Sequence, residues 1–400
     1  MNSRERVLTT MEHQEPDRVP IDFGGGPTRI TVRAHEELKR LLRLTGGKSA
    51  LDLTWQTVAP DERVLQEFKV DTRWLGIDLI FPALEYPINF EEISKLVPLE
   101  EKEDGRYLTD LFGVKYRMPK NGYYFDMISH PLERPEVEEL NKIAFPDPSD
   151  QKYKEKFESL EKKAKFLYEK TEYALVAHGF GLGIFEHCWA LRGLDRFLVD
   201  LLRNKKFAEA LLDRIAEYQI ACWGELLKYI GDYVHVAQVG DDLGTQIGPM
   251  ISQDIYRKIV RPRQEKLWKS IKRQANVYLL LHSCGSIYQF IPDFIQMGVD
   301  ALNPIQVSAK NMDTRKLKEE FGEELTFWGG GCDTQKILPY GTSSDVENEV
   351  KRRIQDLAPG GGFVFAQVHN IQDGVPPENM VSMFKAAIRY GIYPMKVSLI

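Results

Sequence analysis

The sequence predicts an α/β protein, a (β/α)8 TIM barrel with an inserted antiparallel hairpin. From about residue 172 onward, short apolar runs alternate with amphipathic helical segments in six successive units. Two more candidate strands lie upstream, and eight alternating strands and helices are typical of this barrel. A chain of 400 residues is long enough for one such domain over residues 1–400. A doubly wound open sheet is the alternative fold, because strand counts from one sequence are error-prone.

The strands are predicted at brief apolar runs, most of which are rich in β-branched or aromatic residues. Such runs are typical of strands buried on both faces of a parallel sheet. In chain order the predicted strands are Val19–Phe23, Trp74–Ile80, Tyr173–His178, Val234–Val239, Val277–His282, Asp300–Asn303, Leu325–Trp328 and Phe363–Gln367.

The helices between these strands have readable ends. Ser344 followed by Glu347 matches a capping box and predicts the start of a helix there. Pro377 fits the first turn of the final helix, and Gly391 is placed to end it. The segment 194–230 is apolar at helical spacing.

Residues 104–132 interrupt the alternation between the second and third strands. They contain glycines, a Lys-Asn-Gly turn signal and alternating aromatic residues. This pattern predicts the inserted antiparallel hairpin. Such an insertion either lines the substrate entrance of the barrel or has no role in substrate binding.

Composition excludes several classes of protein. The formal charge of −6 comes from interspersed acidic and basic residues, so no basic patch predicts nucleic-acid binding. No apolar run approaches the roughly 18 residues of a membrane helix, and the N-terminus lacks a secretory signal. The four cysteines are too few for a disulfide scaffold, and we expect a cytoplasmic protein.

Polar residues follow most of the predicted strands, where a barrel builds its active site at one rim. They are His178, Asp241, Asp242, His282, Cys284, Asn303, Gln306, Cys332, Asp333, Gln367 and His369.

The sharpest pattern among them is His282-Ser283-Cys284 together with Cys332. Two thiolates and one imidazole suit tetrahedral zinc and leave a fourth position open for catalysis. The competing interpretation is that both cysteines are small buried residues and that His282 is a core histidine. A cysteine nucleophile beside His282 is disfavoured, because residues two apart at a strand end are poorly placed to align.

Asp241 and Asp242 are candidates for a general base, a substrate clamp or a displaceable metal ligand. In the alternative interpretation, one of these two aspartates caps a helix and the other is exposed to solvent. We expect His369 to join them as a catalytic residue. Candidate substrate-binding residues are His178, Asn303, Gln306 and Gln367.

Phosphate-binding and serine-hydrolase chemistry have no motif here. The triple-glycine stretches do not form a G-x-G-x-x-G turn, and neither a Walker A sequence nor a G-x-S-x-G elbow is present.

The chain closely resembles the uroporphyrinogen decarboxylase-like superfamily in DDLGTQIGPMIS, HSCGSIYQFIPDFIQMGVDALNPIQ, FWGGGCDTQ and FAQVHNIQDGVPPENM. Its opening RERVLTTMEHQEPDRVPIDFGG is similar to the N-terminus of that superfamily. True decarboxylases carry an arginine-rich loop of the RQAGRYLPEY type, where this chain has DFGGGPTRITVRAHEEL. The resemblance therefore favours the other branch, the cobalamin-dependent zinc methyltransferases.

That branch uses an H-x-C plus distant-C zinc site, which His282, Cys284 and Cys332 match. Asp241 or Asp242 is the candidate fourth ligand. The resemblance implies methyl transfer between a small substrate, such as an aryl methyl ether or a thiol, and the cobalt of a corrinoid. No D-x-H-x-x-G motif is present, so we expect the cobalamin on a partner corrinoid protein.

Two other functions stay open from the sequence. One is a carboxy-lyase of the same barrel acting on a small acid, and the other is a non-catalytic corrinoid-binding module. A methyltransferase would need a small-molecule methyl donor or acceptor, and a homodimer is the assembly left open.

Overall fold

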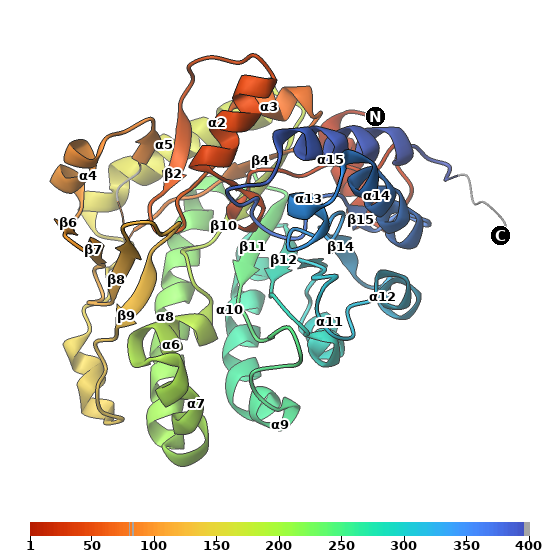
Figure 1. Cartoon of the computed structure of the whole chain (residues 1–400). Helices are drawn as coiled ribbons and strands as arrows, with labels where there is room; N and C mark the ends of the chain where they lie inside the picture. The colour runs from red at the N-terminus through yellow and green to blue at the C-terminus, as the bar shows by residue number, and fades with distance from the viewer. Residues whose placement is uncertain (80, 82–83, 396–400) are drawn as a thin grey trace.

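The computed structural model describes residues 1–79, 81 and 84–395. A curled sheet of parallel strands forms its centre (Figure 1). Its strands are β4 (Thr72–Leu75), β10 (Ala174–His178), β11 (Val236–Gly240), β12 (Tyr278–His282), β13 (Ala301–Asn303), β14 (Thr326–Trp328) and β15 (Phe363–Val364). They pair in the order β15-β14-β13-β12-β11-β10-β4. Each strand therefore lies beside its neighbour in the chain, and the carboxyl ends of all seven meet at one rim.

The predicted first strand, Val19–Phe23, is not a regular strand. Ile21 makes one parallel bridge to Phe365, just after β15. On its other side, the Ile21 carbonyl accepts a hydrogen bond of 2.8 Å from the backbone N–H of Asp71, just before β4. Pro20 has no N–H to donate, so a longer ladder cannot run through it. The segment thus touches both edges of the sheet, while the regular parallel strands of the described chain number seven.

The strand predicted at Trp74–Ile80 begins and ends earlier, as β4, and Ile80 itself lies outside the described residues. The chain leaves the sheet after Leu75 at Gly76. A Cβ at Gly76 would lie 2.1 Å from Nε2 of His178. Only glycine therefore allows the backbone to lie this close to the imidazole ring. The apolar residues after Gly76 therefore do not continue the strand.

A buried carboxylate joins the N-terminal segment to the sheet. Asp22 is fully buried, and its oxygens accept hydrogen bonds from two hydroxyl groups and two indole N–H groups. Because a buried charge is tolerated only when it is hydrogen-bonded, this set of partners fixes the segment in place. The donors are Thr28, Thr72, Trp74 and Trp328.

Helices surround the sheet (Figure 1). One of them, α1 (Ser3–Met11), packs Val7 and Met11 against inward-facing residues of the strands, such as Val176 and Leu280. The others are α2 (Val32–Leu41), α3 (Glu62–Glu67), α4 (Phe90–Leu96), α5 (Gln151–Lys170), α6 (Ile184–Arg192), α7 (Leu194–Arg203), α8 (Lys205–Ile230), α9 (Gln253–Ile255), α10 (Arg261–Gln274), α11 (Ile291–Gln296), α12 (Thr314–Phe321), α13 (Ile337–Tyr340), α14 (Ser343–Leu357) and α15 (Pro377–Tyr390). Among the described residues, none of these helices combines the length and apolar composition that crossing a bilayer requires.

The helix ends agree with the predictions at α15 and differ at α14. Helix α15 begins at Pro377, and Gly391 follows its last residue. Helix α14 is capped by Thr342, whose side chain accepts from the N–H of Asp345. The expected capping box at Ser344 and Glu347 was wrong by two residues, because Glu347 instead accepts a hydrogen bond from Arg389 on α15.

Two small antiparallel sheets lie outside the parallel sheet. In the region predicted as a hairpin, β7 (Gly105–Thr109) and β8 (Lys115–Pro119) pair, and β6 (Leu99–Lys102) and β9 (Asp126–Ser129) extend them to four strands. The second sheet has the order β1-β3-β2-β5 and was not predicted. Its strands are β1 (Ile30–Thr31), β2 (Ser49–Asp52), β3 (Thr57–Val58) and β5 (Leu84–Tyr86).

Candidate metal centre

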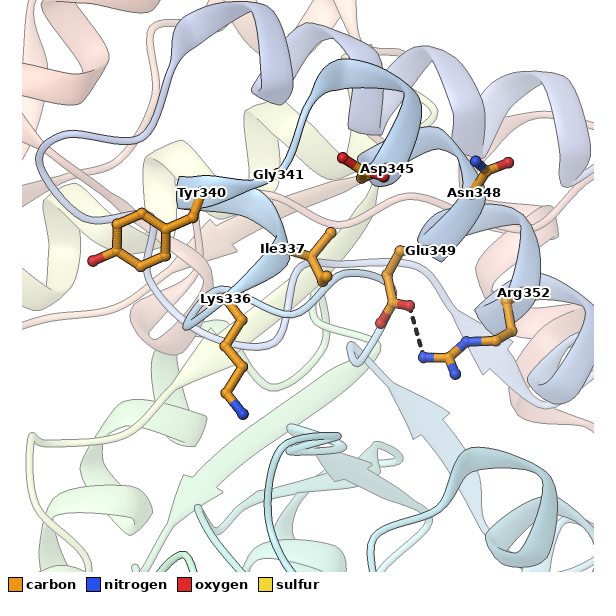
Figure 2. A pocket seen from close by; sticks show the side chains of 8 residues that line it. All are labelled: Lys336, Ile337, Tyr340, Gly341, Asp345, Asn348, Glu349 and Arg352. Atoms are coloured by element: carbon orange, nitrogen blue, oxygen red, sulfur yellow. Dashed lines mark hydrogen bonds and ion pairs between the residues drawn. The ribbon is translucent and has the colours of Figure 1, made fainter.

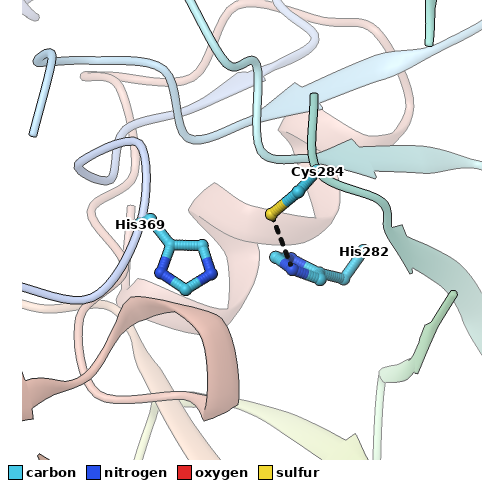
Figure 3. A group of neighbouring side chains, drawn as sticks. All are labelled: His282, Cys284 and His369. Carbon is cyan, nitrogen blue, oxygen red and sulfur yellow. Dashed lines mark hydrogen bonds between the residues drawn. The ribbon is translucent and has the colours of Figure 1, made fainter. Parts of the chain in front are cut away.

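Three potential metal ligands converge at the rim of the parallel sheet. The ligand atoms of His282, Cys284 and His369 all lie within 4.8 Å of one another (Figure 3). Sγ of Cys284 is 3.3 Å from Nε2 of His282, and the centroids of the two imidazole rings are 5.5 Å apart. His282 is the last residue of β12, and His369 lies on the loop after β15. The fold thus brings residues that follow the central strand β12 and the edge strand β15 to one point.

Asn303 fixes the orientation of the His282 ring. Oδ1 of Asn303 lies 2.6 Å from Nδ1 of His282, and Nδ2 of Asn303 donates to the carbonyl of Trp328 at 2.9 Å. Because the amide N–H is turned toward Trp328, the amide oxygen facing the ring can only accept. The proton of His282 therefore lies on Nδ1, and the lone pair of Nε2 is free to bind a metal.

A tight loop aims the Cys284 thiol at the same point. The N–H of Cys284 donates to Oδ1 of Asp242 at 2.7 Å, and the N–H of Gly285 donates to Oε1 of Gln306 at 2.7 Å. Gly285 has a φ of +85°, and a Cβ there would lie 2.6 Å from the backbone of Gly244. Only glycine combines that backbone conformation with so close an approach.

Two carboxyl groups give the cluster a negative environment. Oδ1 of Asp242 is 3.8 Å from Nε2 of His282. Burial raises the pKa of the Cys284 thiol well above its usual value, and the charges of Asp242 and Glu186 raise it further. Burial also raises the pKa of Glu186, with Asp242 and Asp241 acting in the same direction. A cation bound among these groups would relieve both effects.

His369 is neutral at physiological pH. Burial, and to a smaller extent the neighbouring His282, lowers the pKa of His369 to about 4. Since a histidine binds metal through a neutral imidazole, this environment suits a ligand. The sequence predicted His369 as a catalytic residue at the rim. In the structure its ring lies in the group of potential metal ligands with His282 and Cys284.

Cys332 does not join the cluster, contrary to the prediction that it is the third ligand. It is fully buried in the hydrophobic core. The charged groups that act on its thiol are Glu349, Asp333 and Arg353 rather than the rim residues. The preceding glycines turn the chain so closely that a Cβ at Gly331 would lie 2.2 Å from Phe365. In this structure the Cys332 thiol is therefore not among the ligand atoms that converge at the rim.

Asp241 caps a helix rather than facing the rim. Its carboxylate accepts hydrogen bonds from the N–H groups of Phe185 and Glu186 in the first turn of α6, both at 2.9 Å. A third bond of 2.8 Å comes from Gln264. Burial raises the pKa of Asp241 to about 7, against these hydrogen bonds. The alternative of a capping aspartate beside a more exposed one therefore fits the hydrogen bonds of this pair.

The amides predicted to bind substrate instead support the rim. Asn303 holds His282, and Gln306 holds the loop of Cys284. Gln367 is fully buried and donates from Nε2 to the carbonyl of Thr28 at 3.0 Å. All three side chains thus hydrogen-bond to protein groups, while Oε1 of Gln367 is buried without a partner among the described residues.

His178 lies at the end of β10, two strands from β12. It packs against Gly76 and the ring of Trp74. Burial, and to a smaller extent the charge of Arg29, lowers its pKa to about 4. Its neutral ring lies at the rim but outside the metal cluster. Arg29 and Glu186 had no sharp sequence signal, since isolated charged residues occur throughout the chain.

A cavity of about 420 Å³ lies elsewhere, between α13 and α14 (Figure 2). It includes the ion pair between Glu349 and Arg352. No histidine or cysteine lines it, so its residues cannot form a soft-metal site like the one at the rim. They are Lys336, Ile337, Tyr340, Gly341, Asp345, Asn348, Glu349 and Arg352.

Comparison with known proteins places the chain among relatives of one family. The family model of uroporphyrinogen decarboxylase (URO-D) matches residues 106–390. A uroporphyrinogen decarboxylase of Alkalilimnicola ehrlichii is 24% identical over 142 residues, which are 35% of this chain. The matched segment covers only 37% of that relative's length.

Among solved structures, a methyltransferase from Methanosarcina mazei has a similar fold. The TM-score is 0.64, with 16% sequence identity, and the match covers 98% of this chain and 99% of the other. At this identity the likeness establishes the shared fold.

Proposed function

The chain belongs to the uroporphyrinogen decarboxylase (URO-D) family, and from that premise we propose that it is a zinc-dependent methyltransferase. It would move a methyl group between a small substrate, such as an aryl methyl ether or a thiol, and the cobalt of a corrinoid on a partner protein. The observation that carries this proposal is the convergence of His282, Cys284 and His369. We further propose that residues 1–400 form one domain.

The donor set fits zinc. Two neutral imidazoles and one cysteine thiolate are ligands that zinc prefers, and three protein ligands leave a fourth position for substrate. We assign His282, Cys284 and His369 as these ligands, with Asp242 placed nearest the fourth position. When bound, zinc would act as a Lewis acid on the sulfur or oxygen that loses or gains the methyl group.

The protein residues prepare this site in three ways. Asn303 holds the His282 ring with its Nε2 lone pair toward the cluster. Asp242 fixes the Cys284 loop through the backbone N–H. Its side chain is 28% exposed, so an oxygen of Asp242 remains available to accept the proton that a thiol substrate must lose.

A position at the rim also suits the size of a corrinoid. The cofactor of a partner protein must approach the reacting methyl group directly, which a closed cavity would prevent. His282 and Asp242 both retain exposed side-chain surface, 13% and 28% respectively.

A carboxy-lyase acting on a small acid is the second candidate, favoured by the name of the curated relative. Decarboxylation would not require the group of metal-ligand side chains at the rim, so this function leaves that group unexplained. A non-catalytic corrinoid-binding module is the third, and it needs no open ligand position.

Methyl transfer to free cob(I)alamin tests the proposal. The zinc-loaded protein is mixed with cob(I)alamin and a methoxylated aromatic compound, and methylcobalamin is followed by its absorbance. We expect methylcobalamin to form with wild type and not with Cys284→Ala. Release of carbon dioxide from small acids without any methyl transfer would favour the carboxy-lyase instead.

A further inference from the structure

A second cavity, of about 280 Å³, lies between the two small antiparallel sheets. Its walls come from β2 and β5 of one sheet and from β6, β7 and β8 of the other, with α4 beside them. Both sheets lie on the same flank of the barrel (Figure 1). The N–H of Phe125, which lines the cavity, donates to the carbonyl of Thr54 at 2.9 Å and joins them. The cavity shares no residue with the candidate metal centre.

The walls of this cavity are mostly apolar. Nine of the twelve side chains that line it are hydrocarbon or thioether groups, and five of these nine are only half-buried. Atoms that face a hollow lack packing partners on one side, so an apolar ligand would gain dispersion contacts there. An apolar cavity of about 150 Å³ is large enough to take up benzene, so this one has room for a single ring with a short substituent. The five half-buried side chains are Val32, Leu51, Ile88, Phe90 and Met118.

Gln56 offers a free hydrogen-bond acceptor at this cavity. Its Nε2 donates to the carbonyl of Leu53 at 2.5 Å, which fixes the amide, and its Oε1 accepts from no residue that the structure describes. An amide oxygen can only accept, so a ligand must bring the donor. Gln56 also has a φ of +51°, a backbone conformation that glutamine rarely adopts and that is found preferentially at functional sites.

The charge in the walls is already compensated. Nε of Arg106 donates to Oε1 of Glu101 at 3.2 Å, and the guanidinium lies 4.9 Å from the centroid of the Phe90 ring. An anionic ligand would have to compete with Glu101 and would lose its hydration among apolar side chains. Burial and the charge of Glu36 raise the pKa of Tyr86, so its hydroxyl stays uncharged as well. The walls therefore favour a neutral ligand.

We propose that this cavity binds an uncharged single-ring phenol, with its ring among the apolar walls and its hydroxyl donating to Oε1 of Gln56. A phenol combines the flat apolar body that the volume admits with the one donor that the free acceptor requires. Aromatic pairing with Phe90 and Phe125 would add to the contacts. The site needs no metal, so it stands or falls independently of the methyltransferase.

Calorimetric titration of metal-free protein tests the site without any turnover. Three compounds of similar size are compared: 4-ethylphenol, 4-ethylanisole, which lacks the donor, and 4-ethylbenzoate, which is charged. We expect the phenol to bind at one site with a dissociation constant below about 1 mM. The anisole and the benzoate should bind roughly 10-fold more weakly or not at all, because each leaves the acceptor of Gln56 unpaired.

Two variants locate the site. Leu51→Phe fills the cavity and should abolish phenol binding. Gln56→Met removes the acceptor at nearly unchanged side-chain length and should abolish the preference for the phenol over the anisole. Ala50→Phe is the matched control, since Ala50 is the preceding residue of β2 and is exposed. Its side chain points to the opposite face of the strand, so this variant should bind the phenol as wild type does.

Three results would overturn the proposal. They are the absence of saturable phenol binding by wild type, wild-type affinity in Leu51→Phe, and equal or tighter binding of the anisole or the benzoate. If Leu51→Phe fails to fold by circular dichroism, Gln56→Met decides alone: an unchanged preference for the phenol would rule the site out.

Discussion

Asn303 accepts a hydrogen bond from His282, with 2.6 Å between Oδ1 and Nδ1. The pair joins the last residues of two adjacent strands, which the ladder between β12 and β13 sets side by side. Asn303 is fully buried. The orientation of the His282 ring is therefore determined by a buried side chain at the end of the neighbouring strand.

Removing this support should weaken metal binding without removing a ligand. Asn303→Ala is expected to lower zinc affinity roughly 10- to 100-fold, because the His282 tautomer is no longer selected. A competition titration with a chromophoric chelator measures the effect. Asn379→Ala is the matched control, because Asn379 is also buried and its side chain also hydrogen-bonds to other segments, donating to the carbonyls of Leu338 and Gly341. Equal zinc affinities in the two variants would refute the role of Asn303.

Substitutions of the adjacent Asp241 and Asp242 should differ in effect, one on stability and the other on activity. Asp241→Ala is expected to lower the free energy of unfolding by about 2–4 kcal/mol, because it removes the cap of α6 and leaves buried N–H groups unpaired. Asp242→Ala should change stability by less than about 1 kcal/mol yet reduce methyl transfer. Urea denaturation and the cob(I)alamin assay together check both halves. A catalytic role for Asp241 would instead show as lost activity in Asp241→Asn at unchanged stability.

Buried histidines should make the fold sensitive to mild acid. Burial lowers the pKa of His187 from 6.5 to about 4, and its Nδ1 has no partner in the described structure. Between those two pH values the unfolded chain binds the proton more readily, so stability is present above about pH 6.5 and is lost as pH falls toward 4. One such histidine contributes about 1–2 kcal/mol to the loss between pH 7.5 and 5.

His187→Phe tests that sign directly. The ring packs against Phe112 and Tyr218, so phenylalanine suits the same surroundings. The variant should lose less stability than wild type when the pH is lowered from 7.5 to 5 in urea denaturation. An identical loss in both proteins would show that His187 is not protonated on unfolding.

The strands of the parallel sheet could be predicted from the sequence, whereas the group of converging ligand atoms differs from the predicted ligand set in one residue. Six of the seven regular strands were predicted to within a few residues. Buried parallel strands are short apolar runs rich in β-branched or aromatic residues, and these runs are visible in the sequence. His282 and Cys284 lie close together at the rim, as expected from the sequence, because both are within two residues of the end of β12. Their convergence follows from strand direction alone.

The errors arise where the chain leaves a strand. Past β14, Gly329 and Gly330 adopt positive φ angles, and the direction of the next side chain cannot be read from periodicity. Cys332 lies in the hydrophobic core, whereas His369, on another loop, lies beside His282 and Cys284. Interactions such as Asn303 with His282 depend on tertiary register, which a single sequence does not reveal. The sheet β1-β3-β2-β5 was missed because its strands are only two to four residues long.

Zinc content of four purified proteins tests the central claim most directly. Wild type and Cys332→Ala should each carry about one zinc per chain, whereas Cys284→Ala and His369→Ala should carry little, because each loses one of three ligands. Loss of zinc in Cys332→Ala with retention in His369→Ala would restore the ligand set expected from the sequence. A wild-type protein that neither contains zinc nor binds it when supplied would contradict the account altogether.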